Sequence, residues 1–178
     1  MRGMVSIHVK RIGGIWYAVA LNEGMRVKAC GFSVEGRGDL LKQLLGHLPF
    51  NEAFEEVEGD EFAKEVLETL SAIYTGEDVD HSFSLALEGL PPFTKKALEV
   101  TAKIPHGYVT TYGGIAKRLK NRGAARAVGN AEARNPFPLL IPCHRVVRSN
   151  LEVGEYGGDG GVKRRILERE GVKFIGRR

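Results

Sequence analysis

A change of hydrophobic pattern at Pro91-Pro92 divides this chain of 178 residues into two parts. Before it, the sequence from Val5 to Ser33 alternates between apolar and polar residues, which is typical of β-strands. After it, apolar residues recur every three or four positions, which is typical of amphipathic helices. We therefore expect an α+β protein with an α/β domain at 1–90 and a mainly α domain at 91–178.

The first part predicts a three-stranded antiparallel sheet followed by two helices. Gly13-Gly14 and Asn22-Glu23-Gly24 supply the turns between the strands, because glycine adopts a positive φ without steric cost. Leucine-rich stripes predict the helices, one around residues 40–48 and one around residues 62–74. No pattern in this part indicates chemistry, so we expect it to support the rest of the molecule.

The net charge differs sharply between the two parts, although the whole chain carries only +4. Residues 1–90 contain 8 Lys and Arg against 15 Asp and Glu, whereas residues 91–178 contain 18 against 7. A basic part joined to an acidic part favours binding to a polyanion such as nucleic acid. A highly charged surface adapted to heat gives the same imbalance, so charge alone does not decide between the two.

Two short helices joined by a tight turn are predicted in the basic part. Thr111 is a candidate N-cap of the first helix, and the second runs from about Ala124 to Arg134. This second helix carries Arg126 between Ala125 and Ala127, and small side chains let a backbone approach a partner closely. The pattern is typical of a helix-turn-helix, but an αα-hairpin that merely packs would look the same.

A stiff, apolar and proline-rich segment, residues 135–142, ends abruptly in Cys143-His144-Arg145. A free cysteine has a pKa of about 8.5, so a reactive thiolate requires a nearby cation or base. His144 and Arg145 supply such neighbours. Adjacent side chains on an extended segment point in opposite directions, so we expect a water molecule to bridge Cys143 and His144.

Glu170 is the candidate third member of this site. It follows Val162 and Ile166 at a spacing of four residues, on the apolar face of a predicted C-terminal helix. A buried carboxylate is costly unless it is paired, and a histidine beside a reactive cysteine is a natural partner. Cys143, His144 and Glu170 would then act as nucleophile, base and orienting acid. The alternative is that the last turn of this helix is simply exposed.

The run Pro142-Cys143-His144-Arg145-Val146 resembles the active-site signature of the O6-alkylguanine-DNA alkyltransferase family. Further elements resemble this family in the same order and spacing: Tyr112, the Ala-Ala-Arg-Ala-Val-Gly run at 124–129, Asn135-Pro136, and the Val-Gly-Glu-Tyr-Gly-Gly loop at 153–158. The resemblance is strong over residues 91–174. Earlier residues resemble the family only in their general α/β character, as expected of a ribonuclease-H-like supporting domain.

The resemblance implies a DNA-repair enzyme, a methylated-DNA–protein-cysteine S-methyltransferase. Cys143 would take the alkyl group from O6-alkylguanine in duplex DNA and be consumed in a single turnover, without any cofactor. The damaged base would be flipped out through the minor groove, with Arg126 taking its place. Tyr112 would give the leaving guanine a proton hydrogen bond, and Asn135 would fix the Cys143 loop.

The resemblance also implies which residues contact DNA or the flipped base. Besides Arg126, these are Ala125, Ala127, Arg145, Val146, Tyr156 and Gly157. Relatives often carry a serine at the position after Tyr156, and Gly157 lacks that hydroxyl. The pocket is therefore expected to be roomier and to tolerate bulkier alkyl groups.

Two cysteines, Cys30 and Cys143, occur far apart and without the spacing of a disulfide framework or a zinc site. Some relatives bind a structural zinc in the N-terminal domain, but Cys30 has no partner cysteine, so we expect no metal. The sequence contains neither a signal-peptide core nor an apolar segment of membrane-spanning length. We expect a monomer in the cytoplasm, with double-stranded DNA as its partner and no association with membranes.

Two other functions remain open. An alkyltransferase-like protein recognises the lesion but replaces the nucleophile, which the presence of Cys143 argues against. A cysteine hydrolase would use Cys143 and His144 on a small acyl substrate. Such an enzyme would need neither a basic part nor a helix-turn-helix, and it would turn over.

Overall fold

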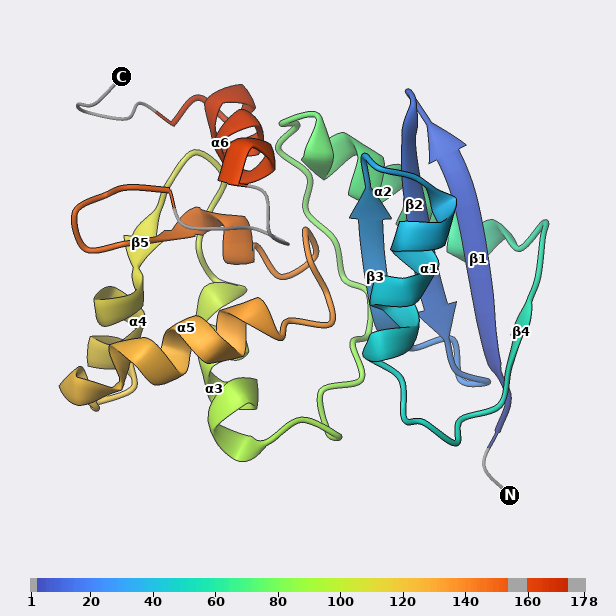
Figure 1. The fold of residues 1–178 in the computed structure, drawn as a ribbon, viewed down its shortest axis with the longest axis horizontal. Coiled ribbons are helices and arrows are strands. Elements are labelled where there is room, and N and C mark those ends of the chain that lie inside the picture. The colour runs from blue at the N-terminus through green and yellow to red at the C-terminus, as the bar shows by residue number, and fades with distance from the viewer. Residues whose placement is uncertain (1–2, 154–159, 173–178) are drawn as a thin grey trace. The chain divides into compact units, whose positions relative to one another are not determined.

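The computed structural model describes residues 3–153 and 160–172, and the chain separates into two compact units (Figure 1). Unit 1 comprises Met1–Ile73, Val79–Gly89 and Pro136–Pro138, and unit 2 comprises Tyr74–Asp78, Leu90–Asn135 and Leu139–Arg178. Three short segments, Tyr74–Asp78, Val79–Gly89 and Pro136–Pro138, therefore belong to a different unit from the residues that flank them in the chain. One of them, Pro136–Pro138, lies in the stretch that leads to Cys143.

Unit 1 is built on a four-stranded mixed sheet in the order β3-β2-β1-β4. Its strands are β1 (Val5–Ile12), β2 (Ile15–Leu21), β3 (Val27–Ser33) and β4 (Phe54–Glu56). The first three pair antiparallel, but β4 adds to β1 in parallel, which corrects the expectation of a three-stranded sheet. β4 has only three residues, all exposed, so no alternation marks it in the sequence. Backbone hydrogen bonds hold it instead, as where Val57 donates to the Ile7 carbonyl at 2.9 Å.

Helices cover the sheet of unit 1. They are α1 (Arg37–Gly46) and α2 (Glu61–Tyr74), and Figure 1 shows α1 in front of the sheet and α2 behind it. Leu40 and Leu44 of α1 pack against Ile7 and Ala20. Tyr17, which points to the opposite face from Ala20, is also fully buried, so both faces of the sheet contribute to the core.

Unit 2 consists mainly of short helices around one core. The helices are α3 (Pro92–Thr101), α4 (Tyr112–Arg118), α5 (Ala125–Ala133) and α6 (Gly160–Arg169), with 3-10 turns η1 (Arg122–Ala124) and η2 (Cys143–Arg145). Two short strands, β5 (Thr110–Thr111) and β6 (Val146–Val147), pair in parallel. The core contains Ile115, Ala116, Val128 and Val146. The mixed α and β content confirms the predicted α+β class.

The predicted helix pair is present as α4 and α5, connected through η1. Thr111 caps α4 as expected, because its side chain accepts a hydrogen bond of 2.9 Å from the Gly114 N–H. On α5, Val128 and Ala131 are buried while Arg126 is exposed, as the periodicity predicts. None of the helices in the described ranges has the length and apolar character that crossing a membrane requires.

Candidate active site

Cys143 is the first residue of η2 and is 6% exposed. Its N–H donates to the Ile141 carbonyl at 2.7 Å, and the Arg145 N–H donates to the Pro142 carbonyl at 2.9 Å. The second of these bonds spans three residues, as in a 3-10 turn, so the segment is not the extended chain we expected. In such a turn, successive side chains are rotated by about 120° and do not point in opposite directions. Cys143 and His144 thus leave the backbone on neighbouring faces.

The segment before Cys143 is held in a strained conformation. Leu139 has a φ of 72°, in the left-handed region that non-glycine residues rarely occupy. The buried Asn135 side chain closes the loop, because its Nδ2 donates to the Ile141 carbonyl at 3.0 Å. This single bond connects the end of α5 to the residue two positions before the nucleophile.

The same segment is also fixed within unit 1. The Cys30 N–H donates to the Pro136 carbonyl at 2.9 Å, and the Cys30 thiol lies 3.4 Å from the Pro138 carbonyl oxygen. Cys30 is 1% exposed, so it is a small residue of the core. The sequence does not reveal that Cys30 contacts Pro136 and Pro138, in the arm (residues 135–142) that leads to Cys143.

His144 and Glu170 form a buried pair in unit 2. The side chains of both are 0% exposed, and His144 Nε2 lies 2.9 Å from Glu170 Oε1. Burial lowers the pKa of His144, and the nearby cations Arg145 and Lys163 lower it further, against the opposing effect of Glu170. We therefore treat the imidazole as neutral. A carboxylate only accepts, so Nε2 carries the proton and Nδ1 is left as the acceptor that can take a proton.

Arg145 completes this arrangement from the other side of Glu170. Its Nε donates to Oε2 and its Nη2 to Oε1, both at 2.9 Å, and its Nη1 donates to the Ile104 carbonyl at 2.8 Å. Burial raises the pKa of Glu170, but the hydrogen bonds from His144 and Arg145 outweigh it and lower this pKa to about 2. Glu170 is consequently an anion that holds the imidazole in one orientation.

This position differs from the DNA contact expected of Arg145. Three of its guanidinium nitrogens are already engaged inside unit 2, and its side chain is only 12% exposed. Val146, also expected at the DNA, is fully buried in the core of unit 2. Neither side chain is therefore placed like a surface group that reaches phosphates or bases.

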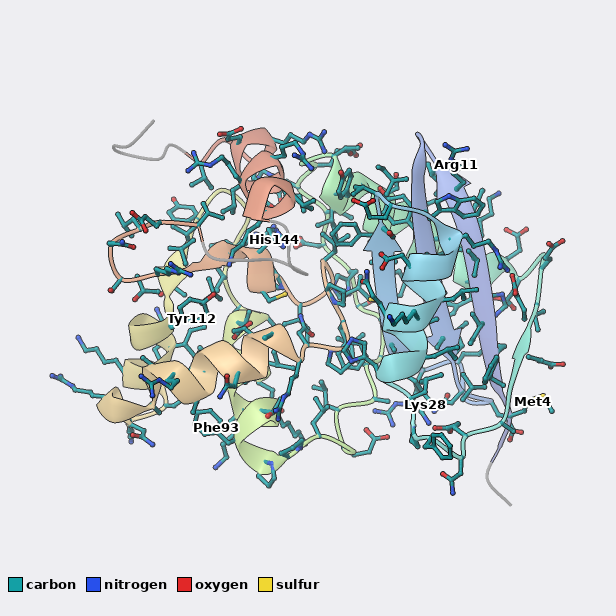
Figure 2. All side chains as sticks on the ribbon, viewed as in Figure 1. Met4, Arg11, Lys28, Phe93, Tyr112 and His144 are labelled. Atoms are coloured by element: carbon teal, nitrogen blue, oxygen red, sulfur yellow. The ribbon has the colours of Figure 1, made fainter. Side chains whose placement is uncertain are left out.

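Tyr112, at the start of α4, and His144, in η2, are labelled in Figure 2. Burial raises the pKa of the Tyr112 phenol, and the negative charges of Glu132 and Cys143 raise it further, against the effect of Arg148. The phenol thus keeps its proton and can act as a hydrogen-bond donor near Cys143.

Sequence reasoning missed a buried lysine in this site. Lys163, on α6, is 1% exposed, and its Nζ donates to the Val146 carbonyl at 2.5 Å and lies 5.8 Å from the ring centroid of Tyr112. Burial lowers the pKa of Lys163, while negative charge on Cys143 and Glu132 raises it. A protonated Lys163 would therefore stabilise negative charge on Cys143.

Glu132 and Thr101 were missed as well. Glu132, on α5, is 7% exposed and lies 2.5 Å from the Thr101 hydroxyl of α3. The sequence did contain a signal that Glu132 is buried, because it follows Val128 by four residues and so lies on the apolar face of its helix. Lys163 of α6 likewise precedes Glu170, the residue that follows α6, by seven residues, which is two helical turns and places both on one side.

The other expected DNA contacts lie on α5 or outside the described residues. Arg126 and Ala127 are exposed and Ala125 is half-buried. Tyr156 and Gly157 fall in the segment 154–159, outside the described residues. Over residues 3–153 and 160–172, no group of three or more His, Cys, Asp or Glu side chains is arranged to hold a metal ion.

Comparison with known proteins agrees with this site. Residues 92–172, which include Tyr112, Cys143, His144 and Glu170, match the family described as 6-O-methylguanine DNA methyltransferase, DNA binding domain. A methylated-DNA–protein-cysteine methyltransferase from Thermococcus sibiricus is 36% identical over 96% of this chain and 98% of that protein. The chain belongs to the methylated-DNA–protein-cysteine methyltransferase family. A relative of the same name from Thermococcus barophilus is 39% identical, with the same coverage of each chain.

Solved structures of methyltransferases have the same fold. The O6-methylguanine-DNA methyltransferase of Pyrococcus kodakaraensis KOD1 superposes with a TM-score of 0.73 and 33% identity, over 95% of this chain and 100% of that one. OGT of Mycobacterium tuberculosis, solved in complex with DNA, gives a TM-score of 0.72 and 26% identity, over 93% of this chain and 92% of that one. The likeness therefore extends to both units of the methyltransferase chain, beyond the part that the family match covers.

Proposed function

We propose that this protein repairs DNA by transferring the alkyl group of O6-alkylguanine directly to Cys143, which is consumed in the reaction. The observation that carries this proposal is the buried carboxylate–imidazole pair of Glu170 and His144, next in the chain to a cysteine whose negative charge interacts with Lys163. Such an arrangement activates a sulfur nucleophile. Curated members of the family carry this activity in their name.

The chemistry is a displacement at the alkyl carbon. His144 accepts the thiol proton, through water, and the thiolate attacks the carbon while its bond to O6 breaks. The electron pair of that bond returns to guanine, which takes up a proton by way of the Tyr112 hydroxyl and leaves as a neutral base. One proton is released by the thiol and one is taken up by guanine. The reaction therefore needs no cofactor, and the thioether product leaves Cys143 without a free thiol.

For DNA recognition, we propose that α4 and α5 act as a helix-turn-helix in the minor groove. The exposed Arg126 would fill the gap left by the flipped base, and the small Ala125 and Ala127 would let the helix approach the backbone. Tyr156 and Gly157 would line the base pocket. The excess of positive charge in residues 91–178 favours this part of the chain as the DNA-binding domain.

Residues 1–90 would form a ribonuclease-H-like supporting domain. Support for this role comes from the buried contact of Cys30 with Pro136 and Pro138, which holds the arm that precedes Cys143. The same contact suggests that this domain stabilises the active conformation of the arm, although it contributes no group to the chemistry.

Protein mass spectrometry after incubation with a duplex containing O6-methylguanine tests the proposal. We expect each protein molecule to gain the mass of one methyl group, mapped to Cys143, and the reaction to stop at one equivalent. Cys143→Ala should abolish the gain, while the matched variant Cys30→Ala should retain it. An unchanged protein mass would refute the proposal, and continued turnover of an acyl substrate would favour a cysteine hydrolase.

A further inference from the structure

Glu132 is a buried carboxyl group for which the proposed mechanism has no role. Its contact with Thr101 shows which protonation state fits the site. The Thr101 hydroxyl oxygen lies 2.9 Å from the Ala97 carbonyl oxygen and 2.5 Å from Glu132 Oε1. A hydroxyl has a single proton, and a carbonyl can only accept. If Glu132 were ionised, one of these two close contacts would join two acceptors without a hydrogen between them.

A protonated Glu132 satisfies both contacts. Thr101 then donates to the Ala97 carbonyl, and the Glu132 carboxylic acid donates to the Thr101 oxygen. The other carboxyl oxygen, Oε2, is buried and has no hydrogen-bond partner among the described residues. A neutral acid tolerates this environment much better than a carboxylate does. The geometry therefore favours the neutral form.

The charged and titratable groups around Glu132 come from several elements of unit 2. Tyr112 of α4 and Lys163 of α6 interact electrostatically with Glu132, and Cys143 of η2 and Arg148, which follows β6, interact in turn with those two groups. The face of α3 that packs here presents the uncharged Ala97, Leu98 and Thr101. Lys163 is the common partner, because both Glu132 and a Cys143 thiolate would draw on the same ammonium group.

We propose that Glu132 is a positioning residue that must be protonated for rapid alkyl transfer, because its ionisation places a second anion beside Lys163 and destabilises the Cys143 thiolate. This inference rests on the proposed function, whose nucleophile it regulates. Ionised Glu132 also makes the Tyr112 phenol a weaker proton donor. Both effects slow the reaction. The group is set to respond near neutral pH, because burial raises the pKa of Glu132 to about 7 even when Lys163 and a hydrogen bond donated by Thr101 to the carboxylate oppose it. A Thr101 that accepts from the neutral acid does not oppose the effect of burial.

The test compares the wild-type protein with Glu132→Gln, which keeps the shape but cannot ionise. Single-turnover rates of transfer from an O6-methylguanine duplex are measured from about pH 5 to about pH 9. We expect equal rates at the acidic end and a variant that becomes roughly tenfold faster than wild type at the alkaline end. The matched control Glu99→Gln, on the exposed face of α3, should follow the wild type throughout. If the ratio of the Glu132→Gln rate to the wild-type rate does not change with pH, the proposal is overturned. A merely structural role of Glu132 would change the rate by the same factor at every pH.

Thr101→Val separates the two directions of the hydrogen bond. If Thr101 accepts a hydrogen bond from a neutral Glu132, replacing Thr101 destabilises the acid form. The fall in transfer rate with rising pH then occurs at a lower pH than in the wild type. If Thr101 instead donates to a carboxylate, the decline moves to higher pH, which would contradict the proposed protonation state.

A second measurement keeps this inference distinct from the proposed function. In a Cys30→Ala background, Cys143 is the only thiol left, and its reaction with iodoacetamide forms a C–S bond as iodide leaves. The Glu132→Gln variant should again react faster than its parent, by a factor that grows as the pH rises. If this gain appears but no methyl transfer occurs at any pH, the proposed function fails while the role of Glu132 stands. If transfer occurs without the gain, only the role of Glu132 fails.

Discussion

Glu170 illustrates how much one side chain depends on its neighbours. Alone in a buried site, a carboxylate would be destabilised by several kcal/mol. Three charge-assisted or polar hydrogen bonds from His144 and Arg145, all of 2.9 Å, reverse that effect. The pKa of His144 is lowered all the same, because burial outweighs the attraction of the carboxylate, and this favours the neutral imidazole that can act as a base.

Replacing Glu170 by Gln should therefore impair both reaction and stability. We expect the single-turnover rate to fall by about 10- to 100-fold, since the imidazole loses its anionic partner. The pKa of Glu170 is lower in the folded protein, about 2, than its ordinary value of 4.5, so the carboxylate stabilises the fold above that ordinary value. This contribution, about 1–3 kcal/mol, is lost as the pH falls toward 2.

Thermal unfolding of wild type and Glu170→Gln at a series of pH values checks this expectation. The wild type should be more stable at neutral pH, and the difference should shrink as the pH falls below about 4.5. A difference in unfolding temperature that stays constant down to strongly acidic pH would show that the stabilisation does not come from the ionised carboxylate.

At the scale of elements, the α4–α5 pair depends on a local signal at its start. Thr111 is extended, with φ −99° and ψ 161°, and its hydroxyl caps α4. The backbone of the same residue pairs with Val147 in the short β5–β6 ladder. Thr111 thus fixes the N-terminus of α4 and connects α4 to β6, the strand that follows η2.

Thr111→Val tests the cap, because valine retains the preference for extended backbone but lacks the acceptor. We expect a loss of about 1 kcal/mol in the free energy of unfolding, equivalent to a fall of about 2–4 °C in Tm for a chain of this size. Thr111→Ser keeps the hydroxyl and should remain close to wild type. A Thr111→Val variant as stable as the wild type, measured by calorimetry, would mean that the cap does not contribute.

At the scale of the whole molecule, charge is divided along the chain. Residues 91–178 have 18 basic against 7 acidic side chains, whereas residues 1–90 have 8 against 15. Binding to DNA should consequently weaken steeply with salt, because each phosphate contact releases counterions. With about four such contacts, affinity for an undamaged duplex would fall about 100-fold between about 50 and 200 mM salt.

Charge-neutralising variants show which part of the chain makes these contacts. Lys120→Gln and Arg122→Gln, exposed between α4 and α5, should each reduce the slope of log affinity against log salt by about one. Lys42→Gln, exposed on α1, is the matched control and should leave the slope unchanged. The slopes are measured by fluorescence anisotropy. If Lys42→Gln reduces the slope and the other two variants do not, the DNA contacts lie on residues 1–90.

Local patterns in the sequence were sufficient to predict much of this protein. Alternation predicted the first three strands, helical periodicity predicted α1, α2 and α4 to α6, and Thr111 marked the start of α4. These features depend on interactions between residues close in the chain, namely steric limits on the backbone and the burial of one face. The run around Cys143 was specific enough to indicate the family. β4 was missed because its pairing uses only backbone groups.

The sequence by itself thus determined the helices, most of the strands, the nucleophile and its family. Only the tertiary structure decided how the buried charges pair: Arg145 with Glu170, and Glu132 with Thr101 near Lys163. Periodicity can place a charged residue on an apolar face, but it cannot name the partner. That choice depends on which side chains from distant parts of the chain meet once water is excluded, because there an unpaired charge is too costly to persist.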